Sequence, residues 1–176
     1  LRLLREAGAL VDAVSPGEIE RALRAGFETR REPPSIVFTA DVIDAATLER
    51  VVALGIPVNA GSADMLEQIG RRQSGHPVWI RVNPGFGHGH SRKTNTGGPV
   101  SKHGIWHEQL DDCLRRADRH GLAVTGIHMH IGSGTDLEHL AQVCGSMEKA
   151  ASAVGRTIKT VSAGGGLPTP YQEGQQ

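Results

Sequence analysis

The sequence has little of what marks a nucleic-acid-binding, membrane-spanning or disulfide-rich protein. Acidic and basic side chains balance at 19 each, and no run of Lys or Arg exceeds two, so the basic surface that nucleic acid needs is not indicated. Apolar runs such as Val51 to Leu54 are far shorter than the ~20 residues that span a bilayer. The two cysteines, Cys113 and Cys144, form no CxxC pair, which favours free thiols in a reducing cytoplasm.

The two ends of the sequence both predict a cut through a larger protein. The chain begins without Met, inside a predicted helix over Leu1 to Gly8 with Gly8 as its C-cap, and it stops in a polar tail over Tyr171 to Gln176. Its 176 residues can form one core, but a closed (β/α)8 barrel needs roughly 250.

Short apolar segments alternate with amphipathic ones along the chain. Glycines and capping residues punctuate them, as in Ser15-Pro16-Gly17-Glu18, which matches a capping box. The pattern predicts strands over residues 9–14, 35–39, 57–59, 78–82, 124–130 and 157–162, and helices over residues 16–25, 45–54, 63–69, 108–120 and 137–154. Such alternation is typical of a parallel sheet covered by helices. It fits an open doubly wound sheet or an incomplete (β/α)8 TIM barrel of about six units, and we favour the barrel.

One strand and the turn that follows it organise these predictions. Residues two apart on a strand share a face, so His128 and His130 are expected to point the same way. The turn Gly132-Ser133-Gly134 offers backbone N–H groups and a hydroxyl to an anion, and the predicted helix after it adds partial positive charge. A second turn, Gly164-Gly165-Gly166, closes the next strand. We expect the two turns to hold one phosphate group between them.

Further polar residues stand where the other predicted strands end. In parallel α/β folds these ends share one rim, which is where sites form. The Ser residues are most simply read as helix caps. Asp12 lies within its strand, before the capping residue Ser15, so capping explains it less well. Arg81 lies in an apolar strand, where a guanidinium should meet an anion or other acceptors. The full set is Asp12, Ser15, Thr39, Asn59, Ser62, Arg81 and Asn83.

Two other functions and a non-catalytic reading compete with a phosphate site. A dinucleotide fingerprint fails in the segment from Gly85, because GxGxxG would need glycine where His90 stands. The HxH pairs His88/His90 and His128/His130 suggest a metal-dependent barrel hydrolase, but no third strand-end histidine is clear and the glycine turns suit a phosphate better. In the non-catalytic reading, the histidines form a polar core and the glycines only allow the chain to turn. We expect no metal.

Five motifs resemble those of the bacterial diaminopimelate decarboxylases, in the fold-type III, alanine-racemase-like family of pyridoxal-phosphate (PLP) enzymes. They keep that family's order and spacing over nearly the whole chain. The motifs are Val11 to Glu18, Arg81 to Gly85, Thr96 to Lys102, His128 to Gly134 and Ala163 to Leu167.

The resemblance implies an activity and a set of site residues. The intact parent enzyme would be a cytoplasmic homodimer in lysine biosynthesis, and it would remove the D-centre carboxylate of meso-2,6-diaminopimelate to give L-lysine and CO2. By resemblance His130 stacks on the PLP ring, while Ser133 and Gly164 to Gly166 hold the phosphate. Asp12 and Arg81 match positions near the cofactor. A related arginine or ornithine decarboxylase is the alternative.

Several of the family's parts are missing from the sequence. The family binds PLP through a Schiff-base lysine on the first barrel strand, but Lys93, Lys102, Lys149 and Lys159 all stand elsewhere. The Glu-Pro-Gly-Arg turn of the eighth strand and the C-terminal β-domain are also absent, and His103 replaces a common Phe. We therefore expect strands two to seven of eight, and a piece that does not catalyse alone.

Overall fold

The computed structural model describes residues 1–89, 94–133, 136–155 and 158–166. In these ranges a parallel sheet carries the strands β1 (Val11–Ala13), β2 (Ile36–Phe38), β3 (Val58–Ala60), β4 (Pro77–Asn83), β6 (Ala123–His128) and β7 (Thr160–Ser162). The helices are α1 (Arg2–Glu6), α2 (Pro16–Arg24), α3 (Ala45–Leu54), α4 (Ala63–Gly70), α5 (Leu110–Arg119) and α6 (Leu137–Val154). The predicted alternation is confirmed.

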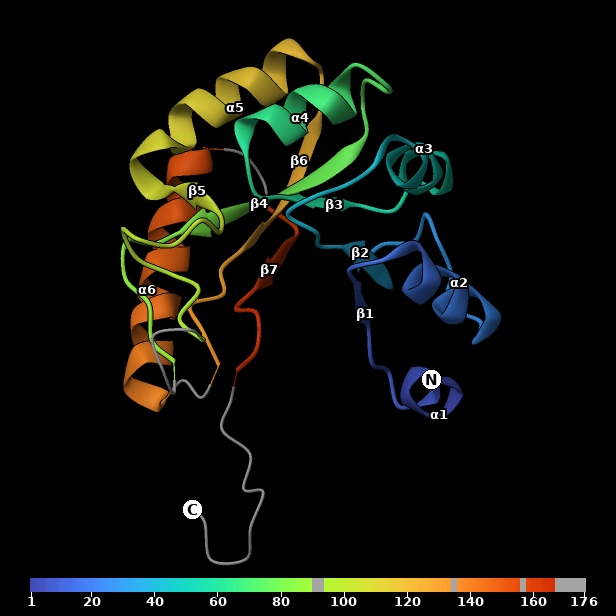
Figure 1. The fold of residues 1–176 in the computed structure, drawn as a ribbon, viewed down its shortest axis with the longest axis horizontal. Helices are drawn as coiled ribbons and strands as arrows, with labels where there is room; N and C mark the ends of the chain where they lie inside the picture. The colour runs from blue at the N-terminus through green and yellow to red at the C-terminus, as the bar shows by residue number, and fades with distance from the viewer. Residues whose placement is uncertain (90–93, 134–135, 156–157, 167–176) are drawn as a thin grey trace, which may run out of the picture.

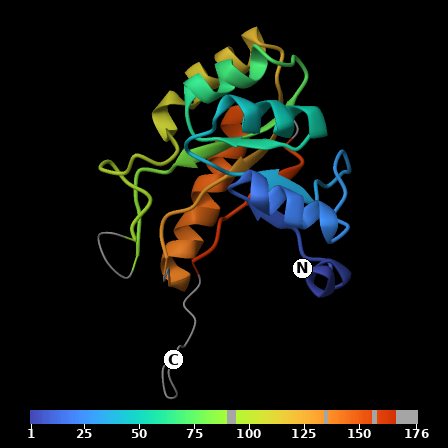
Figure 2. The same ribbon diagram turned by 45° about the vertical axis from the view of Figure 1, so that its right-hand side comes forward.

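The order of the strands identifies the sheet as part of a barrel. Each strand pairs in parallel with the one before it, in the order β1-β2-β3-β4-β6-β7, so the order never reverses as it does in a doubly wound sheet. Helices α2 to α6 run along the outer side of the curved sheet (Figures 1 and 2). The fold is an incomplete α/β barrel, as predicted.

One short strand was not predicted. β5 (Ile105–Trp106) pairs in parallel with the end of β4, through Val82 and Ile105, and lies off the main path of the sheet. A 3-10 turn, η1 (His107–Gln109), links it to α5. Two residues are too few to show an alternating pattern, so β5 has no periodic signal in the sequence.

The capping residues act largely as the sequence predicted. The hydroxyls of Ser15 and Ser62 accept hydrogen bonds from backbone N–H groups of α2 and α4, and the carboxylate of Asp44 caps α3. The capping box around Ser15 differs in one contact, because the Glu18 carboxylate accepts from the N–H of Val14 (2.6 Å). Ser15 and Ser62 are therefore structural.

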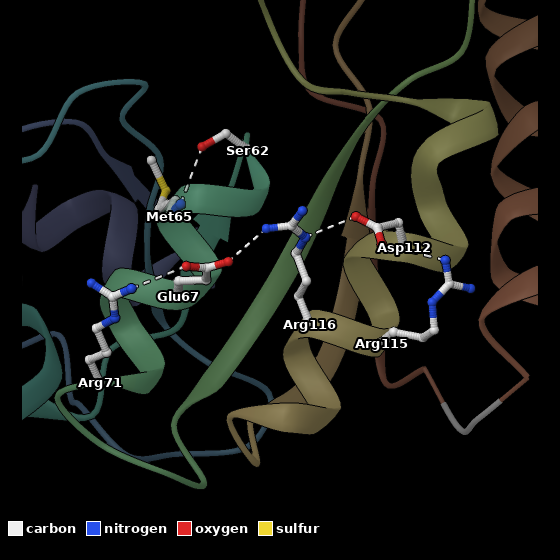
Figure 3. Close-up of polar contacts among 7 residues, drawn as sticks. All are labelled: Ser62, Met65, Glu67, Arg71, Asp112, Arg115 and Arg116. Carbon is white, nitrogen blue, oxygen red and sulfur yellow. Dashed lines mark hydrogen bonds and ion pairs between the residues drawn. The ribbon is translucent and has the colours of Figure 1, made fainter.

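The core lies between the sheet and its helices, and charges join the helices outside it. Phe38, Ile80 and Ile127 are among its fully buried members. On the surface, the Arg116 guanidinium of α5 contacts Glu67 of α4 (2.6 Å) and Asp112 of its own helix (2.8 Å), as Figure 3 shows. The contact to Glu67 ties two neighbouring strand–helix units together.

An irregularity in the β4–β6 pair sets the register of the site. Val78 pairs with Val124, but Trp79 pairs with Gly126, so Thr125 is an extra residue on β6. Beyond this bulge Arg81 stands opposite His128. Gly126 is needed there, because a Cβ on it would come within 2.6 Å of the Trp79 indole.

No helix in the described part of the chain is long and apolar enough to cross a membrane. Within the same ranges both cysteines are free thiols; Cys113 is buried and Cys144 is exposed.

Candidate functional site

A cavity of about 630 Å³ opens at the carboxyl ends of the strands. It contains five of the seven predicted site residues: Asp12, Arg81, His130, Gly164 and Gly165. Thr39, predicted at the same rim, and His128, predicted to point the same way as His130, also line it, together with Val14, Ala40 and Asp41. The predicted convergence on one rim is confirmed for the five site residues and for Thr39 and His128.

Arg81 is the buried cation of this cavity. Its side chain is 10% exposed, and its Nη1 donates to Oδ1 of Asp41 at 3.3 Å. The other carboxylate oxygen, Oδ2, lies 2.5 Å from Nδ1 of His103. The guanidinium thus meets the anion that its apolar strand required, and Asp41 links β4 to the segment that carries His103. Asp41 was missed because it lies three residues beyond the end of β2.

Asp12 projects from β1 toward the same cavity. The surrounding walls desolvate its carboxyl group and raise its pKa above the usual value. A hydrogen bond from Thr39 and the charge of Arg81 act in the opposite direction. Asp12 and Arg81 therefore influence each other electrostatically across the cavity.

His128 is a buried imidazole at the end of β6. Burial lowers its pKa to about 3, with the charges of Arg81 and His130 as smaller causes. Its Nδ1 has no hydrogen-bond partner among the described residues. His128 is neutral near pH 7, and its unpartnered Nδ1 is buried.

His130 lies two residues beyond β6, so the predicted strand was too long at this end. Its side chain still joins that of His128 at the cavity, as predicted. Burial and then Arg81 lower the pKa of His130, and the backbone N–H of Gly165 donates to its Nδ1 at 3.3 Å. A ring nitrogen that accepts a hydrogen bond carries no proton, so the imidazole is neutral here.

The two glycine turns lie against each other, as predicted. A Cβ on Gly164 (φ +73°) would come 2.7 Å from the Cβ of His130, and one on Gly166 would come 3.1 Å from the Cα of Ser133. Side chains are therefore excluded where the turns meet. Ser133 and Gly166 are not among the residues that line the cavity, and Gly134 lies outside the described ranges.

Three N–H groups of these turns, those of Ser133, Gly164 and Gly165, already have acceptors in the protein, and none of these contacts was predicted from the sequence. Ser133 donates to the carbonyl of Thr94 (3.2 Å), and Gly164 donates to Oγ of Ser162 (3.3 Å). The N-terminus of α6 is capped by Asp136, whose Oδ1 accepts from the N–H of His139 (2.9 Å). A carboxylate thus already caps the helix end that was expected to add partial positive charge, and its contribution to anion binding stays a prediction.

In the described part of the chain, the lysines and the histidines of the HxH pairs do not meet at one centre. None of the lysines in the described ranges lines the cavity, and the Nζ of Lys159 pairs with Glu32 instead (3.0 Å). Lys93 and His90 are outside those ranges. His88 lies with Asp136 and His139, while His128 and His130 face the cavity. The described histidines of the two pairs therefore do not converge as a hydrolase centre requires.

Comparisons with known proteins agree with this geometry. The family described as "Pyridoxal-dependent decarboxylase, pyridoxal binding domain" matches residues 1–176. The chain is 63% identical over 174 residues to a Streptomyces coelicolor protein named diaminopimelate decarboxylase, and 61% identical over 176 residues to one of that name from Escherichia coli K12. The matches cover 99% and 100% of this chain but 40% and 42% of those proteins. The chain thus spans about two fifths of their length.

Solved structures give the same relation. A crystal structure of diaminopimelate decarboxylase superposes with a TM-score of 0.91 at 61% identity, over 99% of this chain and 42% of that one. The Helicobacter pylori enzyme complexed with L-lysine superposes with a TM-score of 0.83 at 27% identity, over 99% and 46%. Sequence, fold and cavity together show that the chain belongs to the pyridoxal-binding domain family of the pyridoxal-dependent decarboxylases.

Proposed function

We propose that the chain is the PLP-binding barrel segment of a diaminopimelate decarboxylase. The observation that carries this proposal is the cavity at the strand ends, where His130 meets the turn that follows β7. The identity of 61–63% to proteins of that name supports the substrate. The reaction would remove one carboxylate of meso-2,6-diaminopimelate and leave L-lysine and CO2.

The residues at the cavity fit PLP. Its volume, about 630 Å³, lies within the range of ~300–1,000 Å³ found for small-molecule sites. Gly164 and Gly166 leave no room for side chains between the two turns, and a phosphate can approach bare backbone closely. The N–H of Gly164 meets its protein acceptor over 3.3 Å, so a phosphate would replace a weak partner there, while the N–H of Gly165 stays on His130. Ser133 would add its hydroxyl beside them.

The other polar groups have roles that follow from their charge. The neutral His130 can support an aromatic ring without placing a second positive charge against it. Arg81 keeps a buried positive charge at the cavity, where Asp41 pairs with it, and Asp12 is a second carboxylate on the same lining. When bound, PLP supplies an electron-withdrawing ring that stabilises the negative charge left on carbon as CO2 departs.

An arginine or ornithine decarboxylase is the second candidate. The chain superposes on a Chlorella virus arginine decarboxylase with a TM-score of 0.80, but at 20% identity, which supports a shared fold alone. The much higher identity to diaminopimelate decarboxylases favours diaminopimelate as the substrate.

The chain would act as part of a longer, dimeric protein. The lysine that binds PLP in this family is expected on a strand that the sequence lacks, so the chain alone should be inactive. The resemblance supports a homodimer, and the two free thiols favour the cytoplasm.

A chimera tests the proposed function. Residues 1–176 replace the matching 42% of the E. coli K12 relative, which supplies the rest of the protein. We expect the chimera to bind PLP and release CO2 from meso-diaminopimelate in preference to arginine and ornithine. A chimera that folds by circular dichroism and binds PLP, yet decarboxylates none of these or prefers arginine or ornithine, would contradict the proposed substrate.

A further inference from the structure

Three potential metal ligands meet outside the cavity. His88 comes from the loop after β4, and Asp136 and His139 come from the start of α6. One ligand atom from each lies within 4.8 Å of the other two. Nε2 of His88 is 3.6 Å from Oδ2 of Asp136, and Nδ1 of His139 is 2.7 Å from Oδ1 of the same carboxylate.

Capping of α6 explains only part of this arrangement. Asp136 caps the helix through the N–H of His139, a role that needs no other side chain. His88 is far away in the sequence, yet its ring stacks on that of His139 with centroids 3.9 Å apart and an interplanar angle of 22°. Two imidazoles from separate elements thus flank one carboxylate.

The chemistry of this set suits a transition-metal ion. Imidazole nitrogen and carboxylate oxygen are ligands for Zn²⁺, and sites with three protein ligands commonly complete a tetrahedron with water. The separation of 3.6 Å is close to the edge of a tetrahedron with metal–ligand bonds of about 2.0–2.1 Å. The side chains of His88, Asp136 and His139 are 36%, 53% and 29% exposed, so an ion can enter and the rings can turn toward it.

We propose that His88, Asp136 and His139 bind a divalent transition-metal ion such as Zn²⁺. The ion would replace the direct contact between Nδ1 of His139 and Oδ1 of Asp136, and it would join the loop after β4 to α6. It would act beside the cavity and take no part in its chemistry. This inference goes beyond the proposed function and differs from our expectation from sequence that no metal binds.

The position of His88 gives the ion a structural consequence. The backbone N–H of His88 donates to the carbonyl of Ile131 (3.1 Å), and a Cβ on Gly132 would collide with the His88 carbonyl oxygen. The proposed ion would therefore brace the turn that contains Ser133 from its outer side. Metal binding should lower the mobility of this turn.

Titration of the metal-free, PLP-free chimera with zinc chloride tests the proposal. Calorimetry should show one ion bound to the parent chimera, and Co²⁺ used as a probe should give a visible absorption band. His88→Gln and His139→Gln should each weaken binding at least tenfold. Asp136→Asn should do the same while helix content is retained, because Asn also caps helices. His107→Gln, which removes an exposed histidine outside the cluster, should have no effect.

Two results would overturn the proposal. One is zinc binding that is absent in the parent chimera or unchanged in both His88→Gln and His139→Gln. The other is binding that is lost in His130→Gln, which would move the ion into the cavity. Neither result depends on decarboxylation, so failure here is separate from failure of the proposed function.

Discussion

The backbone N–H of Gly165 donates a hydrogen bond to Nδ1 of His130 over 3.3 Å. This contact joins the segment after β6 to the turn after β7, and it fixes the ring nitrogen that carries no proton. The imidazole proposed to support the cofactor is therefore oriented by the turn proposed to hold the phosphate. A substitution in the turn should therefore also change the orientation of the His130 ring, and a substitution of His130 should also change the turn.

His130→Ala in the chimera should lower turnover much more than stability. The side chain is only partly buried and lies beyond the strand, so we expect kcat to fall at least a hundredfold and the free energy of unfolding by about 1 kcal/mol. Steady-state kinetics and urea denaturation measure the two quantities. Loss of folding with unimpaired turnover per folded molecule would contradict the proposed stacking role.

Gly164→Ala should weaken PLP binding at least tenfold. Its φ of +73° strains any other residue, and the new Cβ would come 2.7 Å from the Cβ of His130. Gly145→Ala is the matched control, since a Cβ on this exposed residue of α6 meets no atom within 4 Å. Fluorescence titration with PLP should show unchanged affinity for the control. Equal affinities in the two variants would argue against a phosphate site at Gly164 to Gly166.

Arg81→Gln should raise the pKa values of His128 and His130. The Arg81 charge opposes protonation of both rings, so its removal makes the imidazolium forms easier to reach. NMR titration of the imidazole C–H signals follows each ring. Arg115→Gln, at an exposed residue of α5, should leave both values in place, and an unchanged His130 in Arg81→Gln would show that the two groups do not interact.

His128 should make stability fall as the solution becomes acidic. Its pKa drops from 6.5 to about 3 on folding, so below pH 6.5 the unfolded chain binds the proton first. The stabilisation present at neutral pH is then lost as the pH decreases, by about 2 kcal/mol between pH 7 and pH 5 for this group. Urea denaturation at both pH values should give a loss smaller by that amount in His128→Gln. Equal losses in the two proteins would show that His128 does not stay neutral.

The chain alone should form no stable covalent adduct with PLP. Lys159 pairs with Glu32, and Lys102 and Lys149 lie away from the cavity lining. Borohydride treatment followed by peptide mass spectrometry should find no stoichiometric label on any of the four lysines. A single lysine labelled to completion would mean that the chain carries its own PLP-binding lysine.

The sequence predicted the fold well because its local signals agree with each other. Ser15, Asp44 and Ser62 are good helix caps, and the apolar segments between them have the length of buried strands. The order of the strands in the sheet could not be predicted from this pattern, since the same alternation fits two topologies. The pattern alone favoured the barrel only slightly, the family resemblance strengthened that prediction, and the structure confirmed it.

The site was predicted less completely. His130, Arg81 and the glycines stand in recognisable motifs, whereas Asp41 follows a strand at no fixed spacing, and its contacts to Arg81 and His103 depend on the folded sheet. Asp136, the N-cap of α6, was also not predicted. Long-range pairs of this kind have no local period in the sequence.

The extra residue at Thr125 decides which face of the sheet the side chains at the end of β6 point to. With an uninterrupted ladder from Val78 onward, Arg81 would face Ile127, and both imidazoles after it would turn toward the helical layer. Because of this irregularity, β6 can place apolar side chains against the helices and still direct its polar residues into the cavity. An insertion or deletion between Ile127 and His130 would therefore inactivate a decarboxylase built on this chain more surely than most substitutions in its core.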